Sequence, residues 1–320
     1  MRTVLALFLA AALGACSSDG TGDDSGGDDG TTDPPVVEEP EIPPDLLLES
    51  PDLTIDPGQE ITYCWYFRTA NTKPLAIKEW RSTMTPGSHH MIMYTTANQV
   101  MEPGTVSTVN CGPGSGFAMW TYSTQIPDDA LMLPSDDGAG KPLAIEIPAG
   151  QAGFLQMHYN NRSDQPIKAH VRLAGYALGE GAAFTKTAAF VTYNGDINIP
   201  PQTTGDLETK TCTIPQNVKF WLMSTHSHKQ AVRTAVKDGQ PTNGAVIFES
   251  ADWEHPGAKR WDQPFYTFTT SKLTYECTYN NPSNRTIRTG DSAQTDEMCM
   301  ASGYFFPATR PMFCFNNITL

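Results

Sequence analysis

The segment from residue 220 to residue 231 is an apolar, aromatic run that ends in two histidines, His226 and His228. On an extended strand, residues two apart point to the same face, so the two imidazoles would project side by side. Two neutral imidazoles on one strand make half of a site for a first-row metal. The same spacing also fits a solvent-facing polar pair, so the remaining chemistry-bearing residues must decide between the two interpretations.

Three further histidines lie on predicted strands. His89 and His90 follow a turn-prone Pro-Gly-Ser sequence and open an apolar strand, and His158 lies within the apolar run 153–160. Adjacent residues on a regular strand face opposite ways, so binding of one metal by His89 and His90 requires a bulge, a distorted strand end, or the Nδ1 atom of one ring. Without a metal, the pair is a polar strand start and His158 is hydrogen-bonded packing.

Met298 lies in a polar loop, residues 294–300, that leads into an apolar strand. A methionine beside a strand is ordinarily part of a core. A thioether next to two imidazoles, however, gives two nitrogens and one soft sulfur, a set that favours copper, and Cu(I) above all, over zinc or magnesium.

The first fifteen residues predict export. Arg2 provides a positive start, residues 4–13 form a short apolar stretch, and Leu-Gly-Ala precedes Cys16. The stretch is too short to span a bilayer and is typical of a signal peptide. The sequence resembles a bacterial lipobox, which implies cleavage before Cys16 and a lipid on its thiol; the alternative is an ordinary signal peptide with a chance cysteine. Because Ser17 and not an aspartate follows, we expect anchoring at the outer membrane.

Residues 16–45 predict an acidic tether rich in Gly, Ser, Asp and Pro. Such a segment cannot bury enough apolar surface to offset its ordering entropy. Most of the net charge of −14 lies here, so the acidity says little about a substrate. No basic stripe is present, which excludes the electrostatic signature of a nucleic-acid-binding protein.

The remaining chain predicts an all-β protein of two sandwich domains, residues 46–180 and 181–320. Aromatic and β-branched residues are plentiful, Gly and Pro recur about every ten residues, and no long helical period occurs. The boundary is placed at Gly179-Glu180-Gly181. Predicted strands cover residues 59–68, 91–96, 143–147, 153–160, 169–178, 217–224, 245–249, 266–270 and 272–279.

Six cysteines remain after Cys16, and an even number in an exported chain predicts disulfides. If no bridge crosses the domain boundary, Cys64 pairs with Cys111, and three pairings remain open for Cys212, Cys277, Cys299 and Cys314. No two of them form a CxxC pair, which argues against a thiolate zinc site.

The four motifs occur in a fixed order: His-His-Met, then Leu-Gln-Met-His-Tyr, then His-x-His, then Asp-Glu-Met-Cys. From about residue 60 to residue 314, this order resembles the type II, ascorbate-dependent copper monooxygenases, the family of peptidylglycine α-hydroxylating monooxygenase and dopamine β-monooxygenase. The resemblance implies two antiparallel jelly-roll sandwiches that face each other across a solvent-filled cleft. It also implies the bridges Cys64–Cys111, Cys212–Cys314 and Cys277–Cys299.

The resemblance implies two copper sites of different chemistry. His89, His90 and His158 resemble the ligands of the electron-transfer copper, and His226, His228 and Met298 those of the oxygen-binding copper. The implied reaction hydroxylates a substrate C–H group with dioxygen and a reductant such as ascorbate. His170 and His255 match no ligand of the family.

The sequence departs from the peptide-hydroxylating members at the residues that hold the substrate carboxylate. Ser224 replaces an arginine, and Met300 and Ser302 replace an asparagine and a tyrosine. A C-terminal glycine peptide is therefore a poor substrate, and Met300, Phe305 and Trp221 hint at a more apolar pocket.

The function predicted from the sequence is a lipid-anchored, monomeric copper monooxygenase with an unidentified small-molecule or peptide substrate. The main alternative is a non-catalytic lipoprotein that binds or sequesters copper. A β-sandwich adhesion module with incidental histidines is a third interpretation, and the six matched ligands argue against it.

Overall fold

The computed structural model describes residues 42–320 except residue 113, and residues 43–320 form one compact unit. The predicted signal peptide, the predicted lipidation site Cys16 and most of the predicted tether lie outside these residues. Within the part of the chain that the structure describes, no helix is long and apolar enough to cross a bilayer.

The described residues of the first half, from residue 42 on, contain thirteen strands and one short 3-10 helix, η1 (Ser115–Phe117). The strands are β1 (Leu46–Glu49), β2 (Leu53–Ile55), β3 (Glu60–Arg68), β4 (Leu75–Met84), β5 (Ser88–Thr96), β6 (Val106–Ser107), β7 (Met119–Thr124), β8 (Asp128–Met132), β9 (Leu143–Ile147), β10 (Ala152–Asn160), β11 (Ile167–Ala169), β12 (Val171–Ala177) and β13 (Thr185–Lys186).

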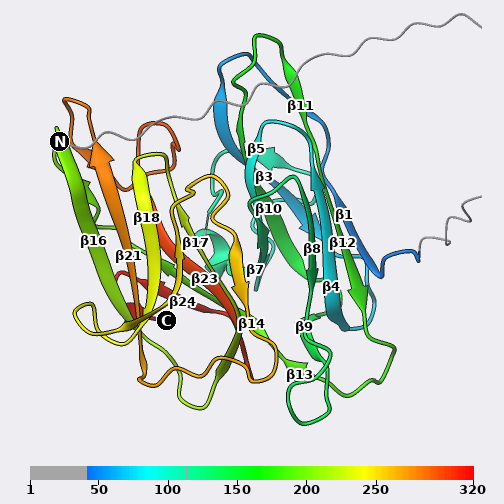
Figure 1. Ribbon diagram of the computed structural model, residues 1–320. Helices are drawn as coiled ribbons and strands as arrows, with labels where there is room; N and C mark the ends of the chain where they lie inside the picture. Colours follow the sequence, from blue (N-terminus) through cyan, green and yellow to red (C-terminus); the bar gives the residue numbers. More distant parts are fainter. Residues whose placement is uncertain (1–41, 113) are drawn as a thin grey trace, which may run out of the picture. The chain divides into compact units, whose positions relative to one another are not determined.

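The second half contains twelve strands, which Figure 1 shows as a group beside the first. They are β14 (Ala188–Tyr193), β15 (Asn198–Ile199), β16 (Thr203–Thr213), β17 (Lys219–Ser227), β18 (Ala231–Asp238), β19 (Ala245–Ser250), β20 (Ala258–Arg260), β21 (Lys272–Asn281), β22 (Ile287–Arg288), β23 (Cys299–Phe306), β24 (Met312–Phe315) and β25 (Ile318–Thr319).

Both halves have the topology of a jelly roll. In the first half, one sheet has the order β1-β12-β4-β9 and the other β3-β10-β5-β7. In the second half, the orders are β20-β17-β23-β14 and β16-β21-β18-β19. If the eight principal strands of each half are numbered along the chain, both halves give the sheets 1-8-3-6 and 2-7-4-5, the arrangement of two interlocked Greek keys. The predicted all-β, two-sandwich fold is confirmed, with parallel pairing at β13–β9 and β14–β24.

The predicted domain boundary lies in the connection between β12 and β13. Because β13 pairs with β9, residues 185–186 belong to a sheet of the first half, and sheet membership changes at β14. The boundary at residue 180 stays a prediction.

One predicted strand is wrong. Residues 266–270 make only an isolated bridge at Tyr266, because the Asp238 carboxylate takes their hydrogen bonds. Its Oδ2 atom accepts bonds from the Tyr266 hydroxyl and from the backbone N–H of Thr269, and its Oδ1 atom accepts one from the N–H of Thr270. Backbone donors satisfied by a side chain are not available to a sheet.

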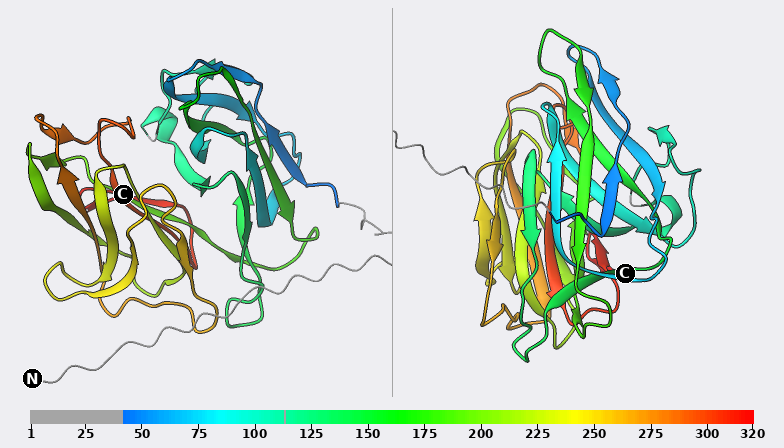
Figure 2. Two further views of the ribbon diagram at one scale, coloured as in Figure 1. Left: turned by 45° about the horizontal axis from the view of Figure 1, so that its top comes forward. Right: turned by 90° about the vertical axis from the view of Figure 1, so that its right-hand side faces the viewer.

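Apolar packing is continuous between the two halves. Trp221 and Tyr304, whose rings stack at a centroid distance of 5.1 Å, belong to the same buried cluster as Trp80 and Tyr122 of the first half. The Tyr304 hydroxyl also donates a hydrogen bond to the carbonyl of Thr121 at 3.2 Å. Figure 2 shows the two sets of strands next to each other from two further sides. This packing holds the β3-β10-β5-β7 sheet of the first half against the β20-β17-β23-β14 sheet of the second half.

Candidate metal centre

The first three candidate ligands lie on two neighbouring strands of the first half. His90 on β5 pairs directly with His158 on β10, and Ser88 pairs with Tyr159, so His89 is the extra residue of a β-bulge. The bulge turns the His89 ring to the same side, 5.1 Å from the His158 ring centroid. Gly87 makes the turn before the bulge with φ +92°, and a Cβ there would lie 2.5 Å from Ile167. The required strand distortion is therefore present.

One interatomic distance and one hydrogen bond indicate which nitrogens of this set can face a single metal ion. His89 Nδ1 and His90 Nδ1 lie 3.0 Å apart, close to the spacing of about 3.3 Å expected for two ligands of one tetrahedral ion. His158 Nε2 donates a hydrogen bond to Glu60 Oε1 at 3.0 Å, because a carboxylate can only accept, which leaves the Nδ1 lone pair of His158 free. The three residues can bring their ligand atoms within 4.8 Å of one another. All three are buried and fit a single metal ion.

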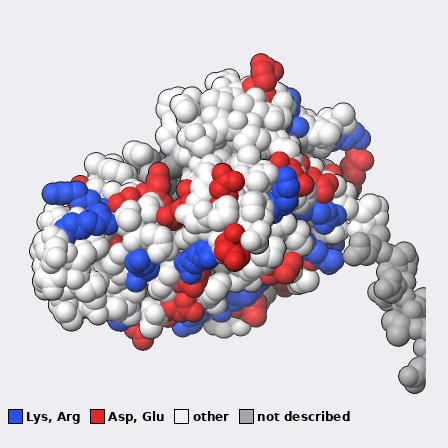
Figure 3. Space-filling model, turned by 90° about the horizontal axis from the view of Figure 1, so that it is seen from above, with Lys and Arg blue, Asp and Glu red and all other residues white. Residues whose placement is uncertain are grey.

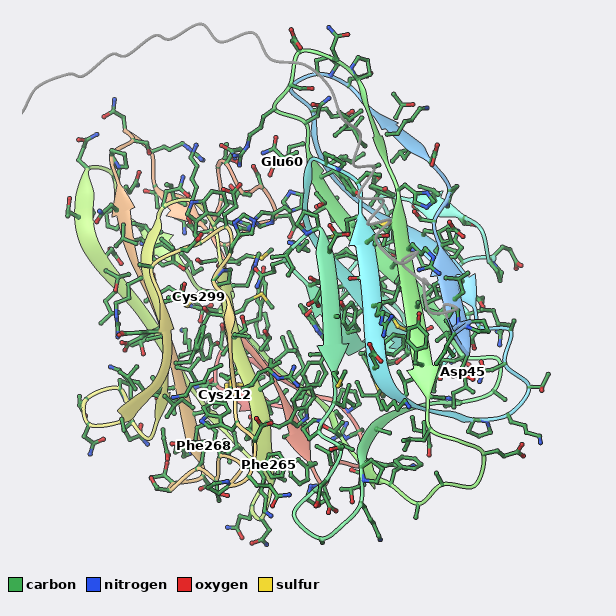
Figure 4. The ribbon with its side chains drawn as sticks, turned by 45° about the vertical axis from the view of Figure 1, so that its right-hand side comes forward. Asp45, Glu60, Cys212, Phe265, Phe268 and Cys299 are labelled. Atoms are coloured by element: carbon green, nitrogen blue, oxygen red, sulfur yellow. A yellow bond between two sulfur atoms is a disulfide. The ribbon has the colours of Figure 1, made fainter. Side chains whose placement is uncertain are left out.

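Glu60 also connects the first half to the loop that carries Met298. Its Oε2 accepts a hydrogen bond from the Ser292 hydroxyl at 2.8 Å, and its Oε1 accepts one from the Ala293 N–H at 2.8 Å. Figure 4 shows Glu60 where the two halves border each other. Burial opposes ionisation, but the hydrogen bonds from His158, Ser292 and Ala293 lower the pKa of Glu60 to about 2. The residue is thus a carboxylate at neutral pH and orients both His158 and the loop.

The second histidine pair lies at the end of β17. His226 Nδ1 donates to Gln125 Oε1 at 2.6 Å, and His228 Nδ1 donates to the carbonyl of Asp296 at 3.1 Å. The Nε2 atoms of both rings are buried and have no hydrogen-bond partner. An unpartnered buried polar atom costs about 1–3 kcal/mol, so two of them on adjacent rings fit a bound metal.

Met298 is held in place by hydrogen bonds to two neighbouring groups. The Glu297 carboxylate accepts hydrogen bonds from the N–H groups of His228 and Met298, and the Tyr279 hydroxyl donates to the Met298 carbonyl at 2.7 Å. Met298 lines the same cavity as His226. Glu297 therefore joins the two segments that supply the second ligand set, although burial raises its pKa to about 8.

Burial favours the neutral form of His89, His90, His226 and His228. It lowers the pKa of His89 to about 3, with a further contribution from the charges of His158 and His228. Burial also lowers the pKa of His228 to about 4 and places the pKa values of His90 and His226 well below the ordinary value. A neutral imidazole has a lone pair available for a metal, so the rings are ready to bind at neutral pH.

The five candidate histidine ligands form one cluster. The His226 ring centroid lies 5.1 Å from that of His90 and 5.5 Å from that of His89, and the His228 ring lies 6.1 Å from that of His89. The resemblance implied two sets separated by a solvent-filled cleft. The structure instead brings the imidazoles of the two sets into contact, because the apolar interface and Glu60 hold the halves together.

A cavity of about 710 Å³ borders this cluster. His90, His158, His226 and Met298 form one part of its wall, and aromatic and aliphatic side chains form most of the rest. The hint of an apolar pocket holds for Met300, which lines the cavity. It is wrong for Trp221, which is buried in the contact between the halves, and for Phe305, which packs in the core of the second half.

The two other histidines in the described residues lie outside the cluster. His170 Nδ1 lies 3.1 Å from the Asp52 carboxylate, and His170 Nε2 lies 3.3 Å from that of Glu49. His255 is exposed and lines a smaller cavity of about 440 Å³ on the side of His89. Neither contributes to a ligand set.

Sequence reasoning missed the residues that orient the ligands: Glu60, Gln125 and Glu297. Glu297 precedes Met298 directly, so its position next to a ligand was a usable signal. Glu60 is 98 residues from His158 and Gln125 is 101 residues from His226, and only the strand pairing and the contact between the halves bring them together.

The structure contains the three bridges that the resemblance implied, Cys64–Cys111, Cys212–Cys314 and Cys277–Cys299. Cys299 directly follows Met298, so its bond to β21 fixes the end of the ligand loop; Figure 4 labels Cys299 and Cys212. Cys212–Cys314 joins β16 to β24, away from Met298 in sequence.

Replacing Cys277 and Cys299 by alanine is expected to lower unfolding stability by about 3 kcal/mol and to weaken metal binding by the second ligand set. Replacing Cys212 and Cys314 opens a longer loop and is expected to cost more stability, about 4–5 kcal/mol, with a smaller effect on metal binding. Thermal unfolding and copper titration of both variants check this. Equal losses of copper affinity would show that the Cys277–Cys299 bridge has no special effect on the loop.

The fold and the site define a protein of two jelly rolls with a histidine cluster and a methionine at their contact. Residues 187–320 match the family model described as copper type II ascorbate-dependent monooxygenase, C-terminal domain, and this match supports that family for the second half of the chain. The matched residues include His226, His228 and Met298. The first ligand set lies outside the match and rests on its motifs and its geometry.

Comparison with curated proteins gave no match. Among solved structures, the chain is similar to the PBSX exported protein XepA, with 7% identity, 81% of this chain and 86% of that chain covered, and a TM-score of 0.23. It is also similar to PBCV-1 VP54 fitted into a reconstruction of the virophage Sputnik, with 5% identity, coverage of 82% and 94%, and a TM-score of 0.28. These TM-scores are too low to support an argument about function.

Proposed function

We propose that this protein is a copper-dependent monooxygenase that hydroxylates a substrate C–H group with dioxygen and an external reductant such as ascorbate. The observation that carries the proposal is that members of two chemically different donor sets, His90 and His158 of one and His226 and Met298 of the other, line one cavity. Three imidazoles form one set, and two imidazoles with a thioether form the other. A site for storage alone has no need of two different sets.

Copper supplies the redox chemistry when bound: activation of dioxygen at the set with the thioether, and an electron from the three-imidazole set. The net reaction inserts one oxygen atom into the C–H bond and releases the other as water, with two electrons from the reductant and two protons. The residues of the chain orient the donors: Gln125 and the Asp296 carbonyl fix the tautomers of His226 and His228, and Glu60 fixes that of His158.

The alternative is a lipoprotein that binds copper without turnover. The contact among all five imidazoles favours it, because a compact, buried group of nitrogens also suits tight retention of copper.

Copper stoichiometry combined with reductant-dependent oxygen uptake separates the two functions. We expect close to two copper ions per chain, and oxygen uptake that requires both ascorbate and copper. His158→Ala should lose one copper ion and keep the second set occupied. Two copper ions without oxygen uptake would favour the binding protein, and one or none in the parent protein would contradict the two-site assignment.

We further propose that the protein is exported and attached by a lipid on Cys16 to the bacterial outer membrane, and that it acts as a monomer. The export motif and three disulfides support this location. Figure 3 shows basic and acidic side chains interspersed on one face, and together with the net charge of −14 this argues against a nucleic-acid partner.

A further inference from the structure

The cavity beside the histidine cluster is built from both halves of the chain. Strands β5, β7 and β10 provide one wall, with Ile92, Tyr94 and Trp120. Strands β17 and β23 and the last residues of the chain provide the other, with Met300 and Phe313. Its volume of about 710 Å³ lies within the range of about 300–1,000 Å³ that holds drug-sized ligands. The space therefore suits a small molecule in contact with His226 and Met298.

The lining carries almost no charge. Asp291 is the one acidic residue among the lining side chains, and no lysine or arginine lines the cavity within the described residues. An anionic ligand would lose its hydration without gaining a basic side chain as a partner, which is unfavourable in an apolar site.

Two polar side chains of the lining, Gln125 and Gln156, are already engaged in hydrogen bonds. Gln125 bonds to His226 and to the Thr225 carbonyl, and Gln156 donates to the Cys111 carbonyl at 2.9 Å. Ser224, which stands where peptide-hydroxylating relatives carry an arginine, donates to the Gly257 carbonyl at 2.6 Å and does not line the cavity. Recognition must therefore come mainly from apolar contact.

The end of the chain extends the apolar wall to the surface. Phe315, Ile318 and Leu320 line the cavity and are 42%, 60% and 60% exposed. Cys314, bonded to Cys212, and the pairing of β24 with β25 hold this segment in place. Exposed apolar side chains continuous with a cavity are typical of a ligand entrance.

We propose that this cavity is the substrate site and that the substrate is an uncharged, largely apolar molecule, held by aromatic and aliphatic side chains and not by an ion pair. The proposal rests on the proposed function, which makes the neighbouring histidines and Met298 the reacting end of the site. It excludes peptides and acids that are recognised through a carboxylate.

Three probes with one apolar skeleton and different charges test this: 4-phenylbutyramide, 4-phenylbutyrate and 4-phenylbutylamine. Calorimetric titration of the full chain, copper-free and copper-loaded, should show binding of the neutral amide and at least tenfold weaker binding of the carboxylate. Tightest binding of the carboxylate or of the amine would overturn the proposal, the latter because Asp291 would then select a cation. Absence of binding by all three probes would also overturn it.

Matched variants locate the binding site. Phe315→Asp introduces a charge into the cavity wall and should weaken binding of the amide at least tenfold. Leu207→Asp, at a similarly exposed apolar residue of β16 that does not line the cavity, should leave binding unchanged. Equal effects of the two substitutions would place the probe elsewhere.

Oxygen uptake keeps the two proposals apart. Amide binding with the expected charge preference but without oxygen uptake would leave the cavity assignment standing and contradict the monooxygenase. Oxygen uptake stimulated by the carboxylate probe and not by the amide would support the monooxygenase and contradict the assignment of the cavity to an uncharged substrate.

Discussion

Met298→Ile is expected to lower reductant-dependent oxygen uptake by at least about a hundredfold, since removal of even an outer residue of a metal site commonly costs 10–100-fold. Isoleucine is apolar and close to methionine in volume, so the cavity wall beside His226 is largely kept while the soft sulfur ligand is lost. Copper retained by the three-imidazole set should remain, so copper content should fall from about two ions per chain towards one. Copper analysis and an oxygen electrode provide the two measurements.

Met223→Ile is the matched control. Met223 is fully buried on β17, the strand of His226, but its side chain packs in the core of the second half. The substitution should cost less than about 1.5 kcal/mol of stability and leave copper content unchanged. Oxygen uptake by the Met298→Ile variant at the rate of the parent would remove Met298 from the proposed ligand set.

Glu60→Ala is expected to weaken binding of one copper ion by about 10–100-fold, the usual effect of removing a carboxylate that orients a ligating histidine. The substitution removes the acceptor for His158 Nε2 and for the Ser292 hydroxyl and the Ala293 N–H, so it also frees the loop before Met298. Glu60→Gln keeps one acceptor oxygen and should lose less. Competition with a copper chelator measures the affinities.

Asp52→Ala tests whether any histidine–carboxylate pair would give the same result. His170 Nδ1 lies 3.1 Å from the Asp52 carboxylate, a pair similar to His158–Glu60 but outside the histidine cluster. Copper affinity should not change in this variant. A Glu60→Ala variant with the copper affinity of the parent would show that Glu60 only joins the two halves.

Much of the strand content could be predicted because burial on one or both faces leaves a local pattern. The run 143–147 and the start of the strand at Lys272 agree with β9 and β21. Strand β16 was missed because it is polar along most of its length and half exposed, so that its sequence, TTGDLETKTCT, lacks an apolar alternation. Residues 266–270 have the right composition for a strand, but Asp238, about 30 residues away, takes their hydrogen bonds.

The donor chemistry follows from residue types and their spacing alone. Residue type decides that His89, His90, His158, His226 and His228 offer nitrogens and that Met298 offers sulfur, and the His-x-His spacing places two rings on one side of a strand whatever surrounds it. The bulge at His89 was also within reach, since two adjacent residues on a regular strand cannot face one metal.

The distance between the two ligand sets, the nitrogens that are free and the surroundings of the ligands depend on contacts between distant parts of the chain. The contact of His226 with His90, the hydrogen bonds of Glu60 and Gln125, and the apolar cavity all join residues of different strands or different halves. Such contacts depend on strand order, register and the packing of one sandwich on the other. These are set by the burial of the whole chain, and no local stretch of sequence encodes them.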